Sequence, residues 1–189
     1  YKFGTMANET VIAQTFNKDL ANEYGKICGN YSLWSNLTIF WGCGTNLHRS
    51  PYNARNHEYY SEDAVLTSGQ AVAFISGGKE YGVIIAPKHL AFNDTEINRT
   101  GVSVFMTEQQ ARENELRGTQ ASIEDAGALG IMTAFNRVGI TAANAHTGLL
   151  KNILRGEWGF KGLESQDFIM NPNYAVLKEY ALNGGTMTT

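Results

Sequence analysis

The 189-residue sequence is poor in the residues that mark several common classes of protein. It contains two cysteines, Cys28 and Cys43, which are too few for a disulfide framework and which we expect to be small buried thiols. Three prolines form no linker, so nothing marks an internal domain boundary. The four histidines lack the H-E-x-x-H spacing of a zinc site. We therefore expect no metal and no cofactor.

Charge and long apolar runs are also scarce. The chain has 15 Lys and Arg against 18 Asp and Glu, a net charge of −3, which argues against a basic nucleic-acid-binding surface. No apolar run reaches the roughly 18 residues of a membrane-spanning helix, and the N-terminus YKFGTMANET lacks the layout of a signal peptide. We expect neither a nucleic-acid nor a membrane partner. The location stays open between cytoplasmic and secreted.

Short apolar stretches alternate with helical patterns along the chain, which predicts βα units and a parallel sheet. An open doubly wound sheet and a (β/α)8 barrel both fit this alternation. Neither G-x-G-x-x-G nor G-x-x-x-x-G-K-[ST] occurs, so a nucleotide-phosphate loop has no support. Expected helices cover residues 9–29, 62–76 with Ser61 as N-cap and Gly77-Gly78 as stop, 107–127 with a Thr107–Gln110 capping box, 146–156 and 173–183. Expected strands are Thr38–Gly42, Val83–Pro87, Ile131–Phe135, Leu163–Asp167 and Thr186–Thr188.

Polar residues stand where the predicted strands end. Lys88 and His89 follow VIIAP, and GLESQ runs into Asp167, whereas TIFWGCG leads into a long loop, residues 45–63, that holds Arg55 and Glu58. A loop of this length in a compact domain is usually functional. Because the carboxyl ends of parallel strands meet at one edge of a sheet, we expect these side chains to converge there.

The chemistry available to such a cluster can be bounded. Asp167 beside Lys88 and His89 is expected to stay ionised at neutral pH, and such an aspartate can be a nucleophile, a metal ligand or a stabiliser of an oxocarbenium ion. Lys88 argues against a metal because it would repel a cation. Simpler explanations also fit: Asp167 as a helix cap, Lys88 and His89 as a solvated pair, and Arg55 and Glu58 as a local salt bridge.

Five motifs, in order over roughly residues 45–168, resemble the barrel domain of glycoside hydrolase family 3, the β-glucosidase and β-xylosidase group. They are TNLHRSPYNARNHEYYSEDAVLTSG, APKHLAFNDTEINR, MTAFNRVG, LLKNILRGEWGFKG and SQDF. The resemblance implies retaining hydrolysis of a β-linked glucoside or related oligosaccharide. In that family an aspartate nucleophile ends a late barrel strand, and a glutamate acid/base usually comes from a separate α/β sandwich domain.

The resemblance also implies roles for residues of this chain. Asp167 in SQDF matches the nucleophile, the Lys88–His89 pair matches the one that hydrogen-bonds the sugar in subsite −1, and Glu58 is expected to orient the nearby arginines. Two residues depart from the family pattern near Asp167: Phe135 replaces a frequent Tyr, and Phe168 replaces a common Trp. The implied substrate-binding residues are Arg55, Lys88, His89, Arg99, Met132, Phe135 and Phe168.

Glu164 is a third departure, because the family usually has an apolar strand residue at this position. We expect Glu164 to be either a buried polar misfit or the sign of a local rearrangement.

Length then becomes informative. A complete (β/α)8 barrel needs about 250 residues. We therefore expect an α/β fold, a partial (β/α)8 TIM-type barrel with parallel strands, in which residues 1–189 form a single incomplete barrel domain without the sandwich domain. Five strands are expected where a barrel has eight. Two alternatives to an active hydrolase follow: an inactive piece that only binds sugar, and a homo-oligomer that completes the barrel from several copies.

Overall fold

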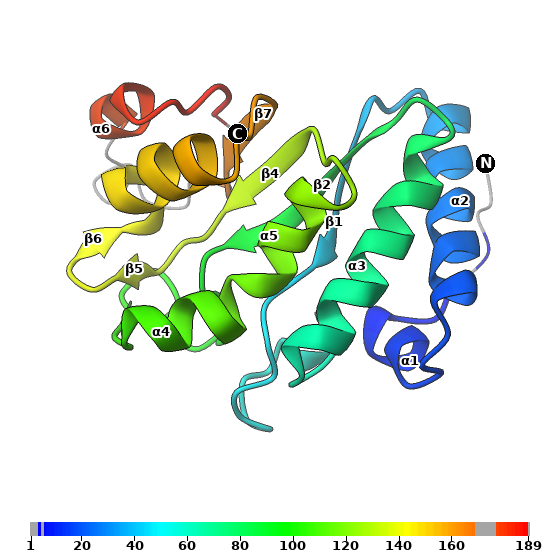
Figure 1. The fold of residues 1–189 in the computed structure, drawn as a ribbon, viewed down its shortest axis with the longest axis horizontal. Helices are drawn as coiled ribbons and strands as arrows, with labels where there is room; N and C mark the ends of the chain where they lie inside the picture. The colour runs from blue at the N-terminus through cyan, green and yellow to red at the C-terminus, as the bar shows by residue number, and fades with distance from the viewer. Residues whose placement is uncertain (1–3, 5, 169–176, 189) are drawn as a thin grey trace.

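The computed structural model of the protein describes residues 4, 6–168 and 177–188. Four strands, all parallel, form its main sheet in the order β1-β2-β4-β7 (Figure 1). Each new strand of this sheet is added beside the previous one, with no reversal of order. This is the arrangement of a barrel wall and not of a doubly wound sheet. The strands are β1 (Ile39–Gly44), β2 (Ile84–Leu90), β4 (Gly130–Thr133) and β7 (Leu163–Gln166).

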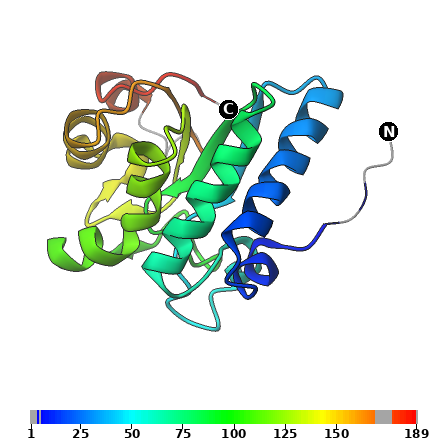
Figure 2. The same ribbon diagram turned by 45° about the vertical axis from the view of Figure 1, so that its right-hand side comes forward.

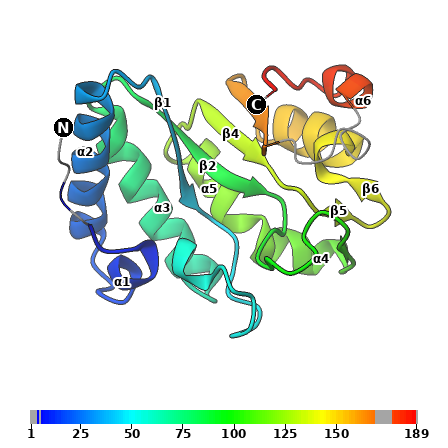
Figure 3. The same cartoon turned by 180° about the vertical axis from the view of Figure 1, so that it is seen from behind.

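Helices cover one face of this sheet and leave the other to form the inside of the barrel wall. Seen from behind, β1, β2 and β4 lie in front of α3 and α5 (Figure 3). In chain order the helical segments are α1 (Glu9–Ala13), α2 (Lys18–Trp34), α3 (Ala64–Lys79), α4 (Glu108–Gln110), η2 (Ala111–Glu115), α5 (Arg117–Glu124), η4 (Gly148–Glu157) and α6 (Leu177–Leu182). Short helical turns η1 (Asn56–Glu58) and η3 (Ala143–Ala145) lie in the connections.

The first predicted helix, residues 9–29, is wrong in two respects, because it is divided into α1 and α2 and because α2 continues to Trp34. Phe16 adopts a positive φ of 53°, which a continuous helix does not allow, and Asn17 caps α2 by accepting hydrogen bonds from the amides of Asp19 and Leu20. The Asn17 cap allows the chain to turn sharply before α2. The short helix α1 is thereby placed against η1 rather than along the sheet.

Helix α3 begins and ends later than predicted. Asp63, not Ser61, is its N-cap, because the Asp63 carboxylate accepts the Leu66 amide at 2.6 Å. The expected stop at Gly77 and Gly78 is wrong, because α3 continues through both to Lys79. A Cβ on Gly77 would lie 2.1 Å from the carbonyl oxygen of Asn22 in α2. Gly77 therefore permits the close contact of α2 and α3, which run side by side (Figure 2).

The later elements follow the prediction more closely. Thr107 caps its helix by accepting the Gln110 amide at 3.1 Å, and this helix continues from α4 through the π-helical η2 into α5. The predicted strand 186–188 is reduced to a single parallel bridge between Met187 and Ser165. Residues 173–176 of the last predicted helix lie outside the described residues, and α6 forms its described remainder.

A small second sheet was not predicted. It joins β3 (Ser103–Val104), β5 (Arg137–Val138) and β6 (Thr141–Ala142), with β3 parallel to β5 and β5 antiparallel to β6. These strands follow the carboxyl ends of β2 and β4 in the chain. They are two residues each, too short to give a periodic sequence signal.

The core consists of two apolar clusters. One surrounds Ile131 on β4, and the other surrounds Phe74 of α3 and Ile85 of β2. Cys28 and Cys43 lie in the second cluster as free buried thiols, as predicted. Within the described ranges, no helix combines the length and the apolar character that a membrane crossing requires.

Candidate active site

Most predicted site residues lie at the carboxyl ends of the parallel strands. Lys88 and His89 are still inside β2, which runs to Leu90, so the expectation that they follow the strand is wrong. Asp167 directly follows β7, and its amide donates to the carbonyl of Thr133 on β4 at 3.1 Å. Although β4 separates β2 from β7 in the sheet, His89 Nε2 lies 3.4 Å from Asp167 Oδ2. The predicted convergence of these two residues is confirmed.

Glu58 joins the two cations of the site. Its Oε1 lies 2.8 Å from Lys88 Nζ, and its Oε2 accepts hydrogen bonds from Arg55 Nε and Nη2 at 2.9 and 2.7 Å. Burial acts to raise the pKa of the Glu58 carboxyl, but Lys88 and Arg55 outweigh it and hold that pKa below its usual value. The predicted i,i+3 salt bridge exists as one half of this longer chain. We call Arg55, Glu58, Lys88, His89 and Asp167 the charged site.

The electrostatics of Asp167 differ from the prediction. Burial raises the pKa of its carboxyl, and the Phe168 amide together with Arg99, Arg55 and Lys88 offsets only part of that rise. The cations therefore do not set the direction of the pKa shift, because the Asp167 side chain is only 14% exposed, and the ionised state of Asp167 at neutral pH stays a prediction. Asp167 Oδ1 accepts the Phe168 amide at 2.8 Å. The alternative of a helix cap concerns residues 169–176, which lie outside the described residues.

The remaining predicted residues surround the charged site. The Arg99 guanidinium lies 4.5 Å from the centre of the Phe135 ring and 3.4 Å, through Nη1, from Glu96 Oε2. Phe135 is buried beyond the end of β4, and Met132 is buried on that strand in register with Lys88. Phe168 is 65% exposed beside Asp167. An exposed aromatic ring at this position offers a flat surface to a ligand.

Two residues that the sequence did not single out, Asn46 and Tyr59, contact His89, and a third, Asn93, contacts Tyr59. Asn46 binds the backbone of His89 through two hydrogen bonds. The Asn46 side-chain amide donates to the His89 carbonyl at 2.9 Å, and Asn46 Oδ1 accepts the His89 N–H at 3.3 Å. The Tyr59 hydroxyl lies 3.0 Å from His89 Nδ1 and 2.5 Å from the Asn93 carbonyl. Tyr59 and Asn93 lie inside the quoted motifs, but residue type alone gives no reason to choose them over their neighbours.

Helix α1 supports the loop that carries Arg55 and Glu58. Glu9 Oε2 accepts the Gly44 amide at the end of β1 at 2.7 Å, and the Thr10 hydroxyl lies 2.7 Å from the Asn56 carbonyl and 2.8 Å from that of Tyr59. Burial raises the pKa of the Glu9 carboxyl to about 8. No sequence signal distinguished these residues.

A second buried network fixes the far side of the same loop. Arg49 Nη2 forms an ion pair with Asp94 Oδ1, while Asn53 Nδ2 donates to Asp94 Oδ2 at 2.9 Å. Arg49 Nε also lies 3.9 Å from Glu115 Oε1, and burial raises the pKa of that carboxyl to about 6. The network therefore ties the 45–63 loop to the connection after β2 and to η2.

Glu164 is the buried misfit that its sequence position predicted. It is 1% exposed, and its two carboxyl oxygens have no hydrogen-bond partner among the described residues. The Tyr180 hydroxyl lies 2.8 Å from the backbone carbonyl oxygen of Glu164 and 2.7 Å from that of Met187. Burial raises the pKa of the Glu164 carboxyl to about 7. Strand β7 nevertheless keeps regular register with β4, so a local rearrangement is not observed.

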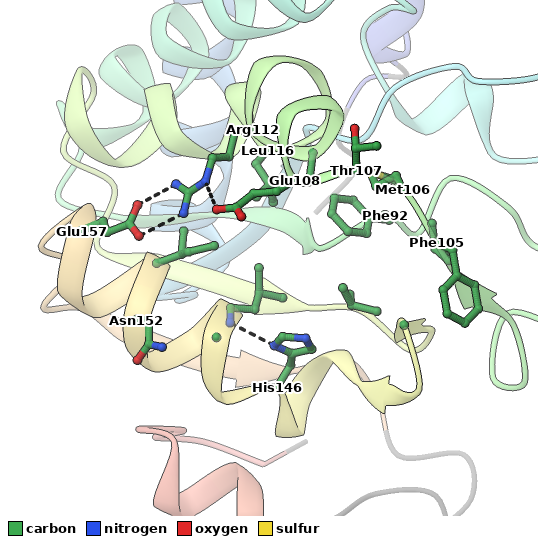
Figure 4. A pocket seen from close by; sticks show the side chains of 17 residues that line it. Phe92, Phe105, Met106, Thr107, Glu108, Arg112, Leu116, His146, Asn152 and Glu157 are labelled. Carbon is green, nitrogen blue, oxygen red and sulfur yellow. Dashed lines mark hydrogen bonds and ion pairs between the residues drawn. The ribbon is translucent and has the colours of Figure 1, made fainter.

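A separate cavity of about 450 Å³ lies between the helical segment of α4 and η2 and the helix η4 (Figure 4). Its lining is mainly apolar, and Arg112 at one end bridges Glu157, with contacts of 2.6 and 3.0 Å, and Glu108, at 2.8 Å. None of the predicted site residues lines it. The charged site is therefore assigned by convergent chemistry and not by this cavity. No group of three or more metal-type side chains is found in the described part of the chain.

Fold and site together define a parallel β/α barrel wall with a carboxylate, a histidine and cations at its strand ends, the edge where barrel enzymes carry their active sites. The chain matches the glycosyl hydrolase family 3 N terminal domain over residues 2–181, and it therefore belongs to that family. The resemblance read from the five motifs is thus confirmed.

Similar proteins and structures agree with this assignment. Probable beta-glucosidase J of Emericella nidulans is 35% identical over 176 residues, 93% of this chain and 20% of that protein. Beta-glucosidase BoGH3A of Bacteroides ovatus is 35% identical over 159 residues, 84% of this chain and 21% of that protein. The structure of beta-glucosidase 3B from Thermotoga neapolitana in complex with glucose has a TM-score of 0.93 at 31% identity, covering 98% of this chain and 26% of that one.

The beta-glucosidase from Kluyveromyces marxianus in complex with glucose gives a TM-score of 0.94 at 28% identity, covering 98% of this chain and 22% of that one. These matches confirm the fold as part of a TIM-type barrel. The chain spans about a fifth of the length of the curated relatives it matches.

Proposed function

We propose that this chain is the barrel part of a retaining β-glycoside hydrolase of the β-glucosidase type, with Asp167 as the nucleophile. The observation that carries the proposal is the position of Asp167: it directly follows β7, lies 3.4 Å from His89 and lies within the field of Arg55, Lys88 and Arg99. A carboxylate at a strand end among hydrogen-bond donors is what attack on a sugar requires.

The reaction proceeds in two displacements. In the first, an Asp167 oxygen forms a bond to the anomeric carbon as the bond from that carbon to the leaving-group oxygen breaks. The leaving group takes a proton from a general acid. In the second, water attacks the same carbon and gives its proton to that group, and the bond to Asp167 breaks. Two inversions leave the β configuration retained.

Glu58 is unsuited to the acid role. Both of its oxygens already bind cations, and its pKa is held below the usual value, so it carries no proton at neutral pH. We propose that the acid/base belongs to a part of the protein beyond residues 1–189, as the family resemblance implies. Residues 1–189 then act as one incomplete barrel domain that supplies the nucleophile and part of subsite −1.

The same geometry favours a glucose-like ring in subsite −1. Arg55 Nη1 is buried with no partner among the described residues, so it is available to donate to a hydroxyl group. Lys88 Nζ lies 2.8 Å from Glu58 Oε1, and His89 Nε2 lies 3.4 Å from Asp167 Oδ2. The similar structures from Thermotoga neapolitana and Kluyveromyces marxianus contain glucose. We propose a β-linked glucoside as substrate, because its hydroxyl groups match this set of polar groups.

Product stereochemistry tests the proposal. An aryl β-glucoside with a good leaving group needs little acid assistance, so hydrolysis by residues 1–189 can be followed by proton NMR. We expect the β-anomer of glucose as first product, and the α-anomer first would contradict a retaining mechanism. In Asp167→Gly, azide attacks the face that the carboxylate leaves open, and α-glucosyl azide is expected. If neither reaction occurs but glucose raises the melting temperature, the chain only binds sugar.

A further inference from the structure

The His89 side chain is 2% exposed, and both of its ring nitrogens have polar neighbours. Nδ1 lies 3.0 Å from the Tyr59 hydroxyl oxygen. Nε2 lies 3.5 Å from Arg55 Nη2 and 3.4 Å from Asp167 Oδ2. The positions of the protons in these contacts decide what His89 can offer to a sugar.

The Tyr59 hydroxyl has one proton to give and two neighbours. It lies 2.5 Å from the backbone carbonyl oxygen of Asn93, which can only accept. An oxygen–oxygen contact this short requires a proton between the atoms, so Tyr59 donates to Asn93. Burial raises the pKa of the Tyr59 phenol well above its usual value, so that proton stays in place. The contact with His89 Nδ1 must then take its proton from the imidazole ring.

The ring itself is neutral. Burial lowers the pKa of His89 well below its usual value, and the Arg55, Lys88 and Arg99 cations lower it further. A neutral imidazole carries one proton, and the Tyr59 contact assigns that proton to Nδ1. Nε2 is then left with a lone pair. The approach of Arg55 Nη2, which can only donate, agrees with a lone pair at that position.

We infer that Tyr59 is a positioning residue that fixes the Nδ1–H tautomer of His89, so that Nε2 meets the substrate as a hydrogen-bond acceptor. This inference rests on the proposed function, since it assumes that a sugar occupies the space beside Asp167 and His89. The hydroxyl group that meets His89 gives its proton to Nε2. Because Nε2 carries no proton, His89 makes no hydrogen bond to ionised Asp167, whose Oδ2 keeps its lone pairs for attack.

The tautomer can be observed without any sugar. In residues 1–189 labelled with nitrogen-15 at histidine, the two ring nitrogens give separate NMR signals for the protonated and unprotonated states, and His89→Asn assigns them. We expect His89 to show protonated Nδ1 and unprotonated Nε2 from pH 6 to pH 8. Protonated Nε2 in the unaltered protein would overturn the inference, whether or not any variant folds.

Tyr59→Phe and Tyr60→Phe form a matched pair of variants. Both tyrosines are buried and adjacent, but only Tyr59 has its hydroxyl beside His89. In Tyr59→Phe the Nδ1 proton loses its acceptor, and we expect the Nε2–H tautomer to appear. In Tyr60→Phe the signals of His89 should not change. Equal signals in the two variants would show that Tyr59 does not set the tautomer.

Sugar analogues test the consequence for binding. A fluorine in place of a hydroxyl group can accept a hydrogen bond but cannot donate one. At the position that meets His89, we expect the fluoro sugar to bind about 2- to 10-fold more weakly than glucose, as weakly as the deoxy sugar. In Tyr59→Phe, the fluoro sugar should bind more tightly than the deoxy sugar, because His89 can then donate from Nε2 to the fluorine. If the fluoro sugar bound more tightly than the deoxy sugar at every hydroxyl position in the unaltered protein, Nε2 would not be an acceptor.

The two proposals fail in different ways. If the unaltered protein binds no glucose, the proposed function fails, while the NMR signals still decide the tautomer. If glucose binds and His89 carries its proton on Nε2, the function stands and the role of Tyr59 is refuted.

Discussion

Two carboxylates, half-buried Glu58 in the charged site and buried Glu164 on β7, show what withdrawal from water does and what counter-charges add. Both are withdrawn from water, which acts to raise their pKa values. Glu58 has Arg55 and Lys88 on its two oxygens, and its pKa falls below the usual value. Glu164 has no partner for its carboxyl oxygens among the described residues, and its pKa rises to about 7.

This difference distinguishes Glu58, whose charge is compensated by neighbouring cations, from Glu164, whose carboxyl group is buried without such compensation. In the charged site, Arg55 and Lys88 favour the ionised form of Glu58, and their charges also act on Asp167. At Glu164 the carboxyl group is most easily kept neutral, since an unpaired buried charge costs several kcal/mol. Burial of a carboxyl group is therefore a poor sign of function by itself, because its hydrogen-bond and ion-pair partners decide whether it is ionised.

The largest effect is expected for Glu58→Gln. The substitution leaves Arg55 and Lys88 without their shared carboxylate, so both side chains lose their orientation. We expect glucose affinity to fall about 10- to 100-fold and the free energy of unfolding at pH 7 to fall by about 1–3 kcal/mol.

Calorimetry and urea titration measure the two effects of Glu58→Gln. Because the pKa of Glu58 is lowered in the folded state, the stability difference should be present above the ordinary value of 4.5 and be lost as the pH falls below it. An unchanged affinity would show that the ion-pair chain does not serve the sugar site.

An effect of opposite sign, on stability and not on sugar affinity, is expected for Glu164→Gln. The folded protein holds a proton on Glu164 up to pH about 7, whereas the unfolded chain releases it near the ordinary value of 4.5. Since the native state binds more protons in this window, Glu164 lowers stability as the pH rises through it. Glu164→Gln should gain roughly 2–3 kcal/mol relative to the unaltered protein between pH 4.5 and pH 8.

Urea titrations of both proteins at pH 4.5 and pH 8 measure the Glu164 effect. Any pH-independent cost of the new amide cancels when the stability differences at the two pH values are subtracted. An equal stability difference at both pH values would mean that Glu164 is ionised in the folded protein. Sugar affinity should be the same in Glu164→Gln and the unaltered protein, because the groups that act on the Glu164 carboxyl, Tyr180, Thr133 and Arg155, are not part of the charged site.

The smallest effect is expected for Arg112→Ala. It removes the bridge between Glu108 and Glu157 at the end of the separate cavity (Figure 4), on exposed side chains. Because exposed ion pairs contribute little and the cavity contains none of the charged site, glucose affinity should stay within about twofold. A large loss of affinity would move the sugar site to that cavity.

The sequence predicted the part of the molecule that depends on local pattern. The parallel strands, the Thr107 cap and the convergence of His89 with Asp167 follow from apolar runs, capping chemistry and the geometry of parallel sheets. The partners of His89 could not be predicted in this way. Asn46 and Tyr59 reach it across 43 and 30 residues of chain, and no pattern within one segment encodes such contacts.

The pKa of Asp167 shows a second limit. Its neighbours in sequence and motif suggested that cations would dominate, but the sign depends on how far the fold withdraws the side chain from water. The same holds for Glu164, whose position in a strand predicted burial without predicting whether a partner would reach it. The sequence shows which residues are ionisable, whereas the direction of each pKa shift depends on burial and counter-charges that only the folded structure shows.

Trapping of the glycosyl intermediate tests the central claim most directly. A 2-deoxy-2-fluoro-β-glucoside with a good leaving group forms a long-lived ester, and peptide mapping by mass spectrometry locates it. The account predicts one fluoroglucosyl group on the peptide that contains Asp167, and none in Asp167→Asn. A fluoroglucosyl group on any other residue, with Asp167 unmodified, would contradict it.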